Sequence, residues 1–521
     1  MRIGVDVGGT HTDAVILKDE ALVAATKATT SHDISSGVIS AVREVLTQSE
    51  VSPDKIDLIT IGTTQFTNAI VERRNISPVA ALRIGAQSSA ALPIAAKWPE
   101  DIFTEAIQST KMIDGGHEYD GGPIIPLDSS DLDAAIAAFK AADAKAIAIS
   151  SVFSTSNPEA ELEAARRVKT AIPSAHISLS HELGRIGLYQ RENATLLNAA
   201  LMALSGDVVA AFETAFEALN LTCPLFMSQN DGTLMSSEFA RRYPVFTFSS
   251  GPTNSMRGAV YLSGETSAMV VDVGGTTSDI GMLIDGFPRP SGAAVAIGGV
   301  LTNFRMPDVL AIGLGGGTII RADGVEIGPQ SVGRDLVTRG LVFGGDTLTA
   351  SDIAIAEGRT KFGDPSKLAS LPPSTKETAL QGMRNMLETG IDRIKTSAKD
   401  LPLVVVGGGG FLVPEELAGV SDILRPENAG VANAIGAAFA QISGEADAIY
   451  STSKRPRDEA LQAAKSSATQ RAVEAGALPS TIEIVEIDET PMSYMDEPGA
   501  VIRAKAVGDV DIARFANSGG A

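Results

Sequence analysis

The chain has 521 residues, 44% of them apolar, and a formal net charge of −21 from 42 basic and 63 acidic side chains. This length exceeds the roughly 250–300 residues that one hydrophobic core serves, so at least two domains are expected. The acidic residues are spread along the chain, which argues against nucleic acid and anionic membrane as main partners.

The redox and targeting signals are those of a cytoplasmic protein. Cys223 is the single cysteine, so no intrachain disulfide can form. The opening residues lack the charged-then-apolar profile of a signal peptide, and no run of 18 apolar residues occurs. We therefore expect a cytoplasmic location and no membrane partner.

The first third of the sequence alternates strand and helix signals. A β-branched strand from Ile3 to Val7 is broken by glycines and resumes from Ala14 to Leu17. Further elements are expected as helices over 37–46, 65–73 and 131–142 and as strands over 56–61 and 144–152. This alternation predicts an α/β fold with helices covering a layered sheet.

The character of the N-terminus returns in the middle of the chain, after a predicted helix over 186–220. Val270 to Leu283 reads VVDVGGTTSDIGML, against IGVDVGGTHTDAVIL for Ile3 to Leu17. Six of the eight positions from Asp6 to Asp13 are identical to those from Asp272 to Asp279. One strand-turn-strand segment thus occurs twice, which predicts a duplicated domain.

The rest of the chain predicts a second lobe and a short addition. A strand over 403–406 leads into Gly407–Gly410, and a helix is expected over 430–442. From about residue 451 a polar stretch, a helix and two strand-like runs over 482–487 and 501–507 follow. We expect domains over 1–185 and 186–445, and a small C-terminal appendix over 446–521.

The two DVGGT segments carry the chemistry. Paired glycines after a strand let backbone N–H groups face an anion, and hydroxyls add donors. Carboxylates suit Mg²⁺, which keeps several of its waters. The candidate metal ligands are Asp6 and Asp272, and Asp13 and Asp279 are the candidates for orienting a nucleophile or a metal-bound water; all four are candidate catalytic residues. The candidate phosphate contacts are Gly8, Gly9, Thr10, Thr63, Thr64, Gly274, Gly275, Thr276 and Thr277.

Each segment alone could be an ordinary tight hairpin, because Asp and paired glycines are common in turns. Two matched copies, followed by a strand and a four-glycine turn, favour a clamp on the β- and γ-phosphates of ATP. Close approach to a flat base and ribose requires missing side chains, so Gly407, Gly408 and Gly409 are candidate adenosine contacts. Gly315–Gly317 is either a site loop or a structural one. No Walker A motif, no Rossmann glycine pattern and no zinc-ligand set occurs.

Seven segments in order resemble the A-type subunit of the hydantoinase/oxoprolinase family. They are DVGGTHTDAVIL, IGTTQFTNAIVERR (61–74), GGHEYDGGP (115–123), SHELGRIGLYQRENATLLNA (180–199), SSGPTNSMRGA (249–259), DVGGTTSD and FGGDTLTASD (343–352). The resemblance implies duplicated actin/Hsp70/sugar-kinase-like (RNase H-like) domains with an interlobe nucleotide cleft. It also implies ATP-dependent opening of cyclic amides such as hydantoins, 5-oxoproline and lactams, with carboxylases as relatives.

The chain departs from the longer members in two respects. His11 stands where those usually carry Phe, and the C-terminal region is reduced. The expected function is an ATP-dependent amide hydrolase subunit using Mg²⁺ and working with a separate B-type subunit in an oligomer. A small-molecule kinase of the same fold, or a non-metabolic ATPase acting on a protein, are the alternatives.

Overall fold

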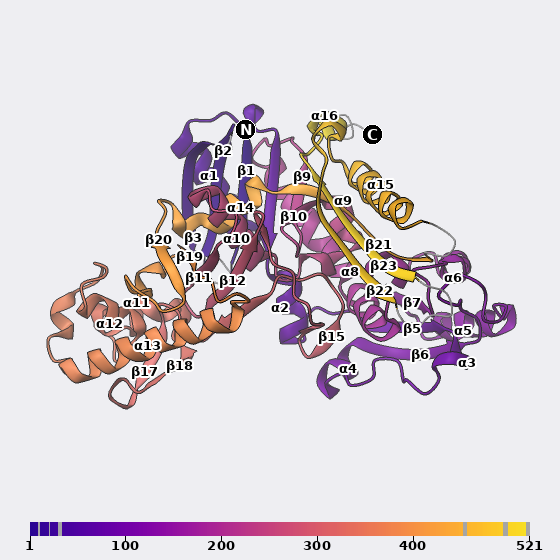
Figure 1. Ribbon diagram of the computed structural model, residues 1–521, viewed down its shortest axis with the longest axis horizontal. Helices are drawn as coiled ribbons and strands as arrows, with labels where there is room; N and C mark the ends of the chain where they lie inside the picture. Colours follow the sequence, from indigo (N-terminus) through magenta and orange to yellow (C-terminus); the bar gives the residue numbers. More distant parts are fainter. Residues whose placement is uncertain (9–10, 20, 30–33, 452–455, 493–498, 517–521) are drawn as a thin grey trace.

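The computed structural model of the chain describes residues 1–8, 11–19, 21–29, 34–451, 456–492 and 499–516. The described residues form five sheets, and Figure 1 shows the three largest: a long sheet across the top and right, a second sheet left of centre, and a small sheet at lower right. The first two sheets carry the two DVGGT hairpins, so their arrangement positions the candidate site.

The first sheet has nine strands and contains the N-terminal hairpin. Within this sheet β1 pairs antiparallel with β2 and parallel with β4. The strand order is β22 (Glu483–Met492), β23 (Gly499–Gly508), β21 (Gln441–Ser451), β10 (Thr233–Ser236), β9 (Leu225–Ser228), β4 (Leu58–Thr63), β1 (Arg2–Val7), β2 (His11–Lys18) and β3 (Ala21–Thr29). Its strands are rich in β-branched residues that suit a pleated, buried surface.

The second sheet repeats the core of the first. Its strands are β16 (Val309–Ile312), β12 (Ser278–Ile284), β11 (Met269–Val273), β19 (Leu401–Val406) and β20 (Val420–Leu424), and the short β13 (Phe287–Pro288) continues from β12. β11 pairs antiparallel with β12 and parallel with β19, as β1 does with β2 and β4. The order β16-β12-β11-β19-β20 therefore matches β3-β2-β1-β4-β9, which confirms the predicted duplication.

The sheets cross the boundaries that the sequence suggested. β9 and β10 follow residue 186 but hydrogen-bond into the N-terminal sheet. The expected C-terminal appendix supplies β21 to β23 of that same sheet, covered by α15 (Arg457–Ala475). A helix expected over 430–442 is shorter, because α14 (Ala432–Phe439) ends where β21 starts at Gln441. The division into folding units at 185 and 445 stays a prediction.

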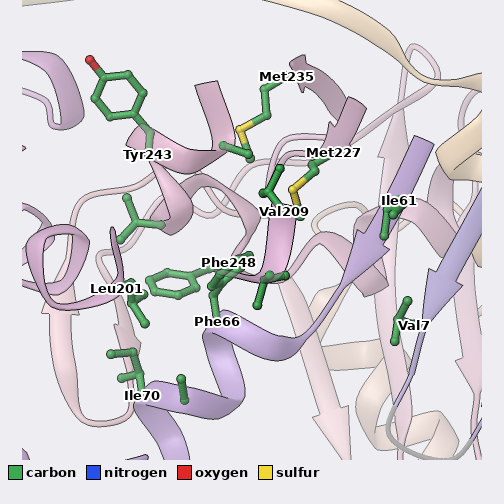
Figure 2. Close-up of a cluster of buried hydrophobic side chains, with 14 of the residues drawn as sticks. Val7, Ile61, Phe66, Ile70, Leu201, Val209, Met227, Met235, Tyr243 and Phe248 are labelled. Carbon is green, nitrogen blue, oxygen red and sulfur yellow. The ribbon is translucent and has the colours of Figure 1, made fainter. Parts of the chain in front are cut away.

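The core of the first lobe is built around α8 (Leu188–Glu217), the helix expected over 186–220. In Figure 2, Phe66 of α2 (Gln65–Glu72) and Phe248 lie beside Leu201 of α8. Length and composition alone would let α8 span a membrane, yet 67% of that stretch is buried inside the protein, as in a core helix. The other predicted helices are α1 (Ile34–Ser49) and α5 (Ser129–Ala141).

A small parallel sheet and a strap complete the first lobe. The sheet order is β6 (Ile107–Ile113), β5 (Val79–Ile84), β7 (Ala146–Ser151) and β8 (His176–Leu179). The strap is the hairpin of β14 (Val295–Ile297) and β15 (Val300–Thr302), which leaves the second lobe after β13 and enters the core of the first. Asn193 Nδ2 donates to the Leu301 carbonyl at 2.8 Å, and Arg73 Nη2 donates to the Gly298 carbonyl at 2.8 Å.

Candidate active site

The two DVGGT segments form hairpins of the same geometry. Asp6 faces Asp13 across the β1–β2 ladder, and Asp272 faces Asp279 across the β11–β12 ladder. Gly274 N–H closes its turn by donating to the Thr277 carbonyl at 2.9 Å, as Gly8 does to the carbonyl three residues on at 3.0 Å. Each turn therefore carries one aspartate on each strand at its base.

The four aspartates lie close enough to perturb one another. Burial, followed by the charges of Asp13 and Asp272, raises the pKa of Asp6 to about 7. Burial and the charge of Asp272 raise the pKa of Asp279 to about 7. Burial also raises the pKa of Asp13 and of Asp272. Buried like charges of this kind are typical of sites that bind a cation or perform chemistry.

Contacts between the lobes join the two hairpins. Asn433 on α14 donates from Nδ2 to Asp6 Oδ2 at 3.3 Å. Ser255, on α10 (Ser250–Ser263), donates to Asp272 Oδ2, and its hydroxyl also contacts Asn433 Oδ1. Hydrogen bonds from these two side chains act against the rise in the pKa of Asp272. The hairpins thus face each other, as the sequence predicted.

Lys27, on β3, is a cation at this site that the sequence reading missed. It pairs with Asp13 in the strand register, and its Nζ lies 2.8 Å from Asp13 Oδ2. Its charge lowers the pKa of Asp6, Asp13 and Asp272 against the effect of burial. A tight β2–β3 turn would not have indicated it, because Lys18 pairs with Ala21 and that register alone would place Thr26 opposite Asp13. A register shift between Ile16 and Leu17 places Lys27 there instead.

The predicted phosphate contacts lie at the ends of the hairpins and beside them. Gly274 is half-buried and Gly275, Thr276 and Thr277 are exposed, whereas the predictions for Gly9 and Thr10 lie outside the described residues. Thr63 is buried and Thr64 half-buried, at the start of α2. They follow Gly62, where a Cβ would crowd the Asp6 carboxylate and the Asn254 amide of α10. The α2 turn is therefore next to the first hairpin.

The four-glycine turn lies against the second hairpin. Gly407 adopts φ +84°, and a Cβ there would overlap the Asp272 carboxylate. Gly409 N–H donates to the Val273 carbonyl at 2.7 Å. Gly407 and Gly408 line a cavity of about 350 Å³ together with Phe411, Arg359, Arg425 and five further residues. This cavity beside Asp272 is where the sequence predicted the adenosine; the assignment stays a prediction.

The sequence left open whether the loop Gly315–Gly317 belongs to the site or is structural. In the structure this loop supports the second hairpin. Gly316 N–H donates to the Gly274 carbonyl at 3.0 Å, and Gly317 N–H donates to the Gly275 carbonyl at 2.7 Å. A Cβ at Gly315 would lie 2.6 Å from the backbone nitrogen of Thr276. Since these amides are used on the hairpin itself, the loop has a structural role.

The donor set fits a divalent cation that keeps its waters. Asp13 Oδ1 is buried without a hydrogen-bond partner, and the neighbouring carboxylates repel one another. Within the part of the chain that the structure describes, no group of three or more His, Cys, Asp or Glu could hold a metal directly. Mg²⁺ commonly binds through one or two carboxylates plus waters and phosphate oxygens. Asp6 and Asp272 would supply those carboxylates.

Valine variants of two glycines in the four-glycine turn should affect ATP affinity and folding stability differently. A Cβ at Gly408 meets nothing within 4 Å, whereas one at Gly409 would lie 2.7 Å from the Val273 side chain. We expect Gly408→Val to fold with little change in Tm and to lose ATP affinity. Gly409→Val should cost roughly 1–3 kcal/mol of stability through overpacking. Thermal denaturation and ATP calorimetry measure both; normal ATP binding by Gly408→Val would contradict the adenosine assignment.

The raised pKa of Asp279 predicts a pH-dependent stability of the metal-free protein. The folded protein keeps this proton up to about pH 7, whereas an unfolded aspartate loses it near its ordinary pKa of 3.8. Stability from this group is therefore lost as pH rises from about 4 through 7, at roughly 1.4 kcal/mol per unit of pKa shift. In EDTA, Asp279→Asn should lose less stability than the wild type between pH 4.5 and 7.5. Urea denaturation at each pH tests this, and parallel slopes would contradict it.

Two like lobes that present matched aspartate hairpins to each other define an actin-like ATPase fold of the kind also found in sugar kinases. Two models of one family match the sequence: the hydantoinase/oxoprolinase N-terminal region over residues 2–172 and hydantoinase/oxoprolinase over residues 191–369. The chain belongs to the hydantoinase/oxoprolinase family, as its motifs predicted.

Curated relatives include two subunits of larger enzymes. The chain is 27% identical over 410 residues to the caprolactamase subunit alpha of Pseudomonas jessenii, covering 74% of this chain and 58% of the relative. It is 26% identical over 431 residues to the acetophenone carboxylase gamma subunit of Aromatoleum aromaticum, covering 76% of this chain and 58% of the relative. The chain thus spans less than two thirds of each relative's length.

Solved structures show the same fold over nearly the whole chain. The ATP-dependent caprolactamase from Pseudomonas jessenii matches with a TM-score of 0.79 at 21% identity, covering 98% of this chain and 87% of that one. Nucleotide-free acetone carboxylase matches with a TM-score of 0.68 at 18% identity, covering 98% and 88%. Relatives of this chain are therefore subunits of ATP-dependent enzymes.

Proposed function

We propose that this protein is an ATP-dependent hydrolase subunit that activates a cyclic amide of the hydantoin, 5-oxoproline or lactam type by phosphoryl transfer. The observation that carries the proposal is the pair of matched hairpins, whose four aspartates face each other between like lobes. Membership of the family and the likeness to a caprolactamase subunit support the substrate class.

Phosphorylation solves the central difficulty of this reaction, because amide resonance makes the carbonyl a poor electrophile. The carbonyl oxygen attacks the γ-phosphorus, ADP leaves with the electron pair of the broken P–O bond, and the ring nitrogen loses its proton. Water then adds to the carbon and the C–N bond breaks, and the nitrogen takes both protons of that water to leave as an amine. The resulting acyl phosphate reacts with a second water, releasing phosphate and leaving the ring-opened amino acid.

The chain's residues would act mainly by positioning and charge neutralisation, as in other phosphoryl transfers. Backbone amides of the two turns would contact the phosphates, and Mg²⁺ held by Asp6 and Asp272 would offset the charge on the phosphate oxygens. Lys27 supplies a further cation beside Asp13. Asp13 and Asp279 would orient water or accept a proton, because burial raises the pKa of both carboxyls, that of Asp279 to about 7.

A separate B-type subunit would complete the enzyme, in a cytoplasmic complex. The two curated relatives are subunits by name. The described residues of this chain belong to the two lobes and their sheets. A permanent complex buries on the order of 2,000 Å² or more. The C-terminal strands are a candidate for part of that surface, since β22 is an edge strand and exposes Ile487.

The test is purified protein with Mg-ATP and a panel of cyclic amides, followed for free phosphate and for ring opening. The chain is assayed alone and after isolation with its native partners. Substrate-stimulated phosphate release with ring opening, in the complex and not in the chain alone, is the expected result.

The other outcomes each point elsewhere. A stable phosphorylated product would indicate a small-molecule kinase, and turnover indifferent to any small molecule would indicate an ATPase acting on a protein. Phosphate release that needs a ketone and bicarbonate would place the chain with the carboxylase relatives. Ring opening at a useful rate by the single chain would contradict the partner requirement.

A further inference from the structure

One helix of each lobe contacts the hairpin of the other lobe. In the first lobe α10 follows the strands β9 and β10, and in the second lobe α14 follows β20. Ser255 of α10 contacts Asp272 of the second lobe, and Asn433 of α14 contacts Asp6 of the first. The cross-lobe contacts therefore follow the same approximate twofold relation as the hairpins.

The two helices cross at such short range that their side chains have fixed positions. A Cβ at Gly436 would overlap the Asn254 carbonyl, and one at Gly258 would overlap the Ala432 carbonyl. These are the carbonyls of the residues next to Ser255 and Asn433. Ser255 is 1% exposed, so its hydroxyl has little freedom to turn to other partners.

Asn433 has the geometry to link both aspartates through one side chain. Its Nδ2 donates to Asp6 Oδ2 at 3.3 Å, and its Oδ1 lies against the Ser255 hydroxyl, whose single proton goes either to that oxygen or to Asp272 Oδ2. Neither Ser255 nor Asn433 has a charge or acid–base chemistry at neutral pH. Their contribution must therefore come from where they hold the two carboxylates.

We propose that Ser255 and Asn433 are positioning residues that hold Asp6 and Asp272 at the separation needed to share one hydrated divalent cation bound to ATP. Side chains that orient metal ligands typically change metal affinity by about 10–100-fold when removed. Repulsion would otherwise push the two carboxylates apart, and the bridge opposes that movement. The inference rests on the proposed nucleotide site and adds to it the residues that couple its two halves.

The test compares ATP affinity with Mg²⁺ and in EDTA for Ser255→Ala and Asn433→Ala. Both variants should lose about 10–100-fold in the Mg²⁺-containing titration and keep the affinity seen in EDTA. A purely structural role would weaken both titrations together. Ser255→Thr retains the hydroxyl and should restore the Mg²⁺-dependent gain.

Matched controls are Ser263→Ala, on the same helix with a hydroxyl that donates to the Ala259 carbonyl, and the exposed Asn385→Ala on α13 (Pro373–Ile394). Both should behave as the wild type. If Asn433→Ala does not fold, Ser255→Ala decides the matter, because it deletes one oxygen atom.

The outcomes separate this inference from the proposed function. A wild type whose ATP affinity gains nothing from Mg²⁺ would overturn both. A wild-type gain that persists unchanged in Ser255→Ala would overturn the inference alone, and a missing ring-opening activity would overturn the substrate class alone.

Discussion

Replacing Asp6 or Asp272 by Asn should weaken Mg-ATP binding by on the order of 10–100-fold or more and abolish turnover. Each carboxylate is one of the two that would hold the hydrated cation, and each comes from a different lobe. Calorimetry with Mg-ATP and phosphate release measure the two effects. Wild-type affinity and turnover in both variants would contradict the two-hairpin site.

The same substitutions should stabilise the metal-free protein, which distinguishes a functional carboxylate from a structural one. Because the pKa of Asp6 is raised to about 7, its ionised form is disfavoured in the fold, and an uncharged amide removes that penalty above neutral pH. We expect a higher Tm for Asp6→Asn in EDTA at pH 8, together with the lost function. Loss of stability and function together would indicate a structural aspartate.

The fold could be predicted as far as its local patterns extend. Hairpins, the repeated DVGGT segment and the alternation of strands and helices all arise from short-range signals, and the structure confirms them. Such local patterns do not determine which strands pair when they lie far apart in the sequence. The runs over 482–487 and 501–507 read as strands, but the pairing of β23 with β21, which joins both strands to the N-terminal sheet, depends on tertiary packing.

The sequence indicates the carboxylates of the candidate site but not the side chains that contact them. Asp6 and Asp272 follow a strand and precede glycines, a local signature. Asn433 lies 427 residues from Asp6 and 178 from Ser255 in the sequence, so no local pattern places these side chains together. The available clue to these contacts was a polar side chain within a helix rich in Gly and Ala.

Family motifs mark structural residues as well as functional ones. Asp352, in the FGGDTLTASD segment, forms a capping box with Thr349 and accepts the Val342 N–H at 2.8 Å. In the segment that contains QRENATLLNA, Glu192 is 2% exposed and accepts from Arg83 Nε at 2.7 Å and Nη2 at 2.5 Å. A motif alone cannot separate these roles, because both demand an invariant polar group.

Arg83→Met should therefore be the most destabilising single change that leaves the nucleotide site intact. Arg83 is fully buried on β5, and removing it leaves the Glu192 carboxylate buried with Ser150 Oγ, at 2.7 Å, as its remaining hydrogen-bond donor. Breaking a buried ion pair from one side costs about 3–5 kcal/mol. Urea denaturation measures this loss, and Mg-ATP affinity below the unfolding transition should be unchanged.

Two comparison variants establish the cause of that loss. Arg166→Met removes an exposed arginine that pairs with Glu163 at 2.8 Å, and it should leave the stability nearly unchanged, because water screens exposed ion pairs. Arg83→Met combined with Glu192→Leu removes both charges and should recover much of the stability lost by the single change, since no uncompensated carboxylate remains. If the stability losses of the single variants Arg83→Met and Glu192→Leu simply add in the double variant, the loss comes from packing. The explanation by an uncompensated buried carboxylate would then be wrong.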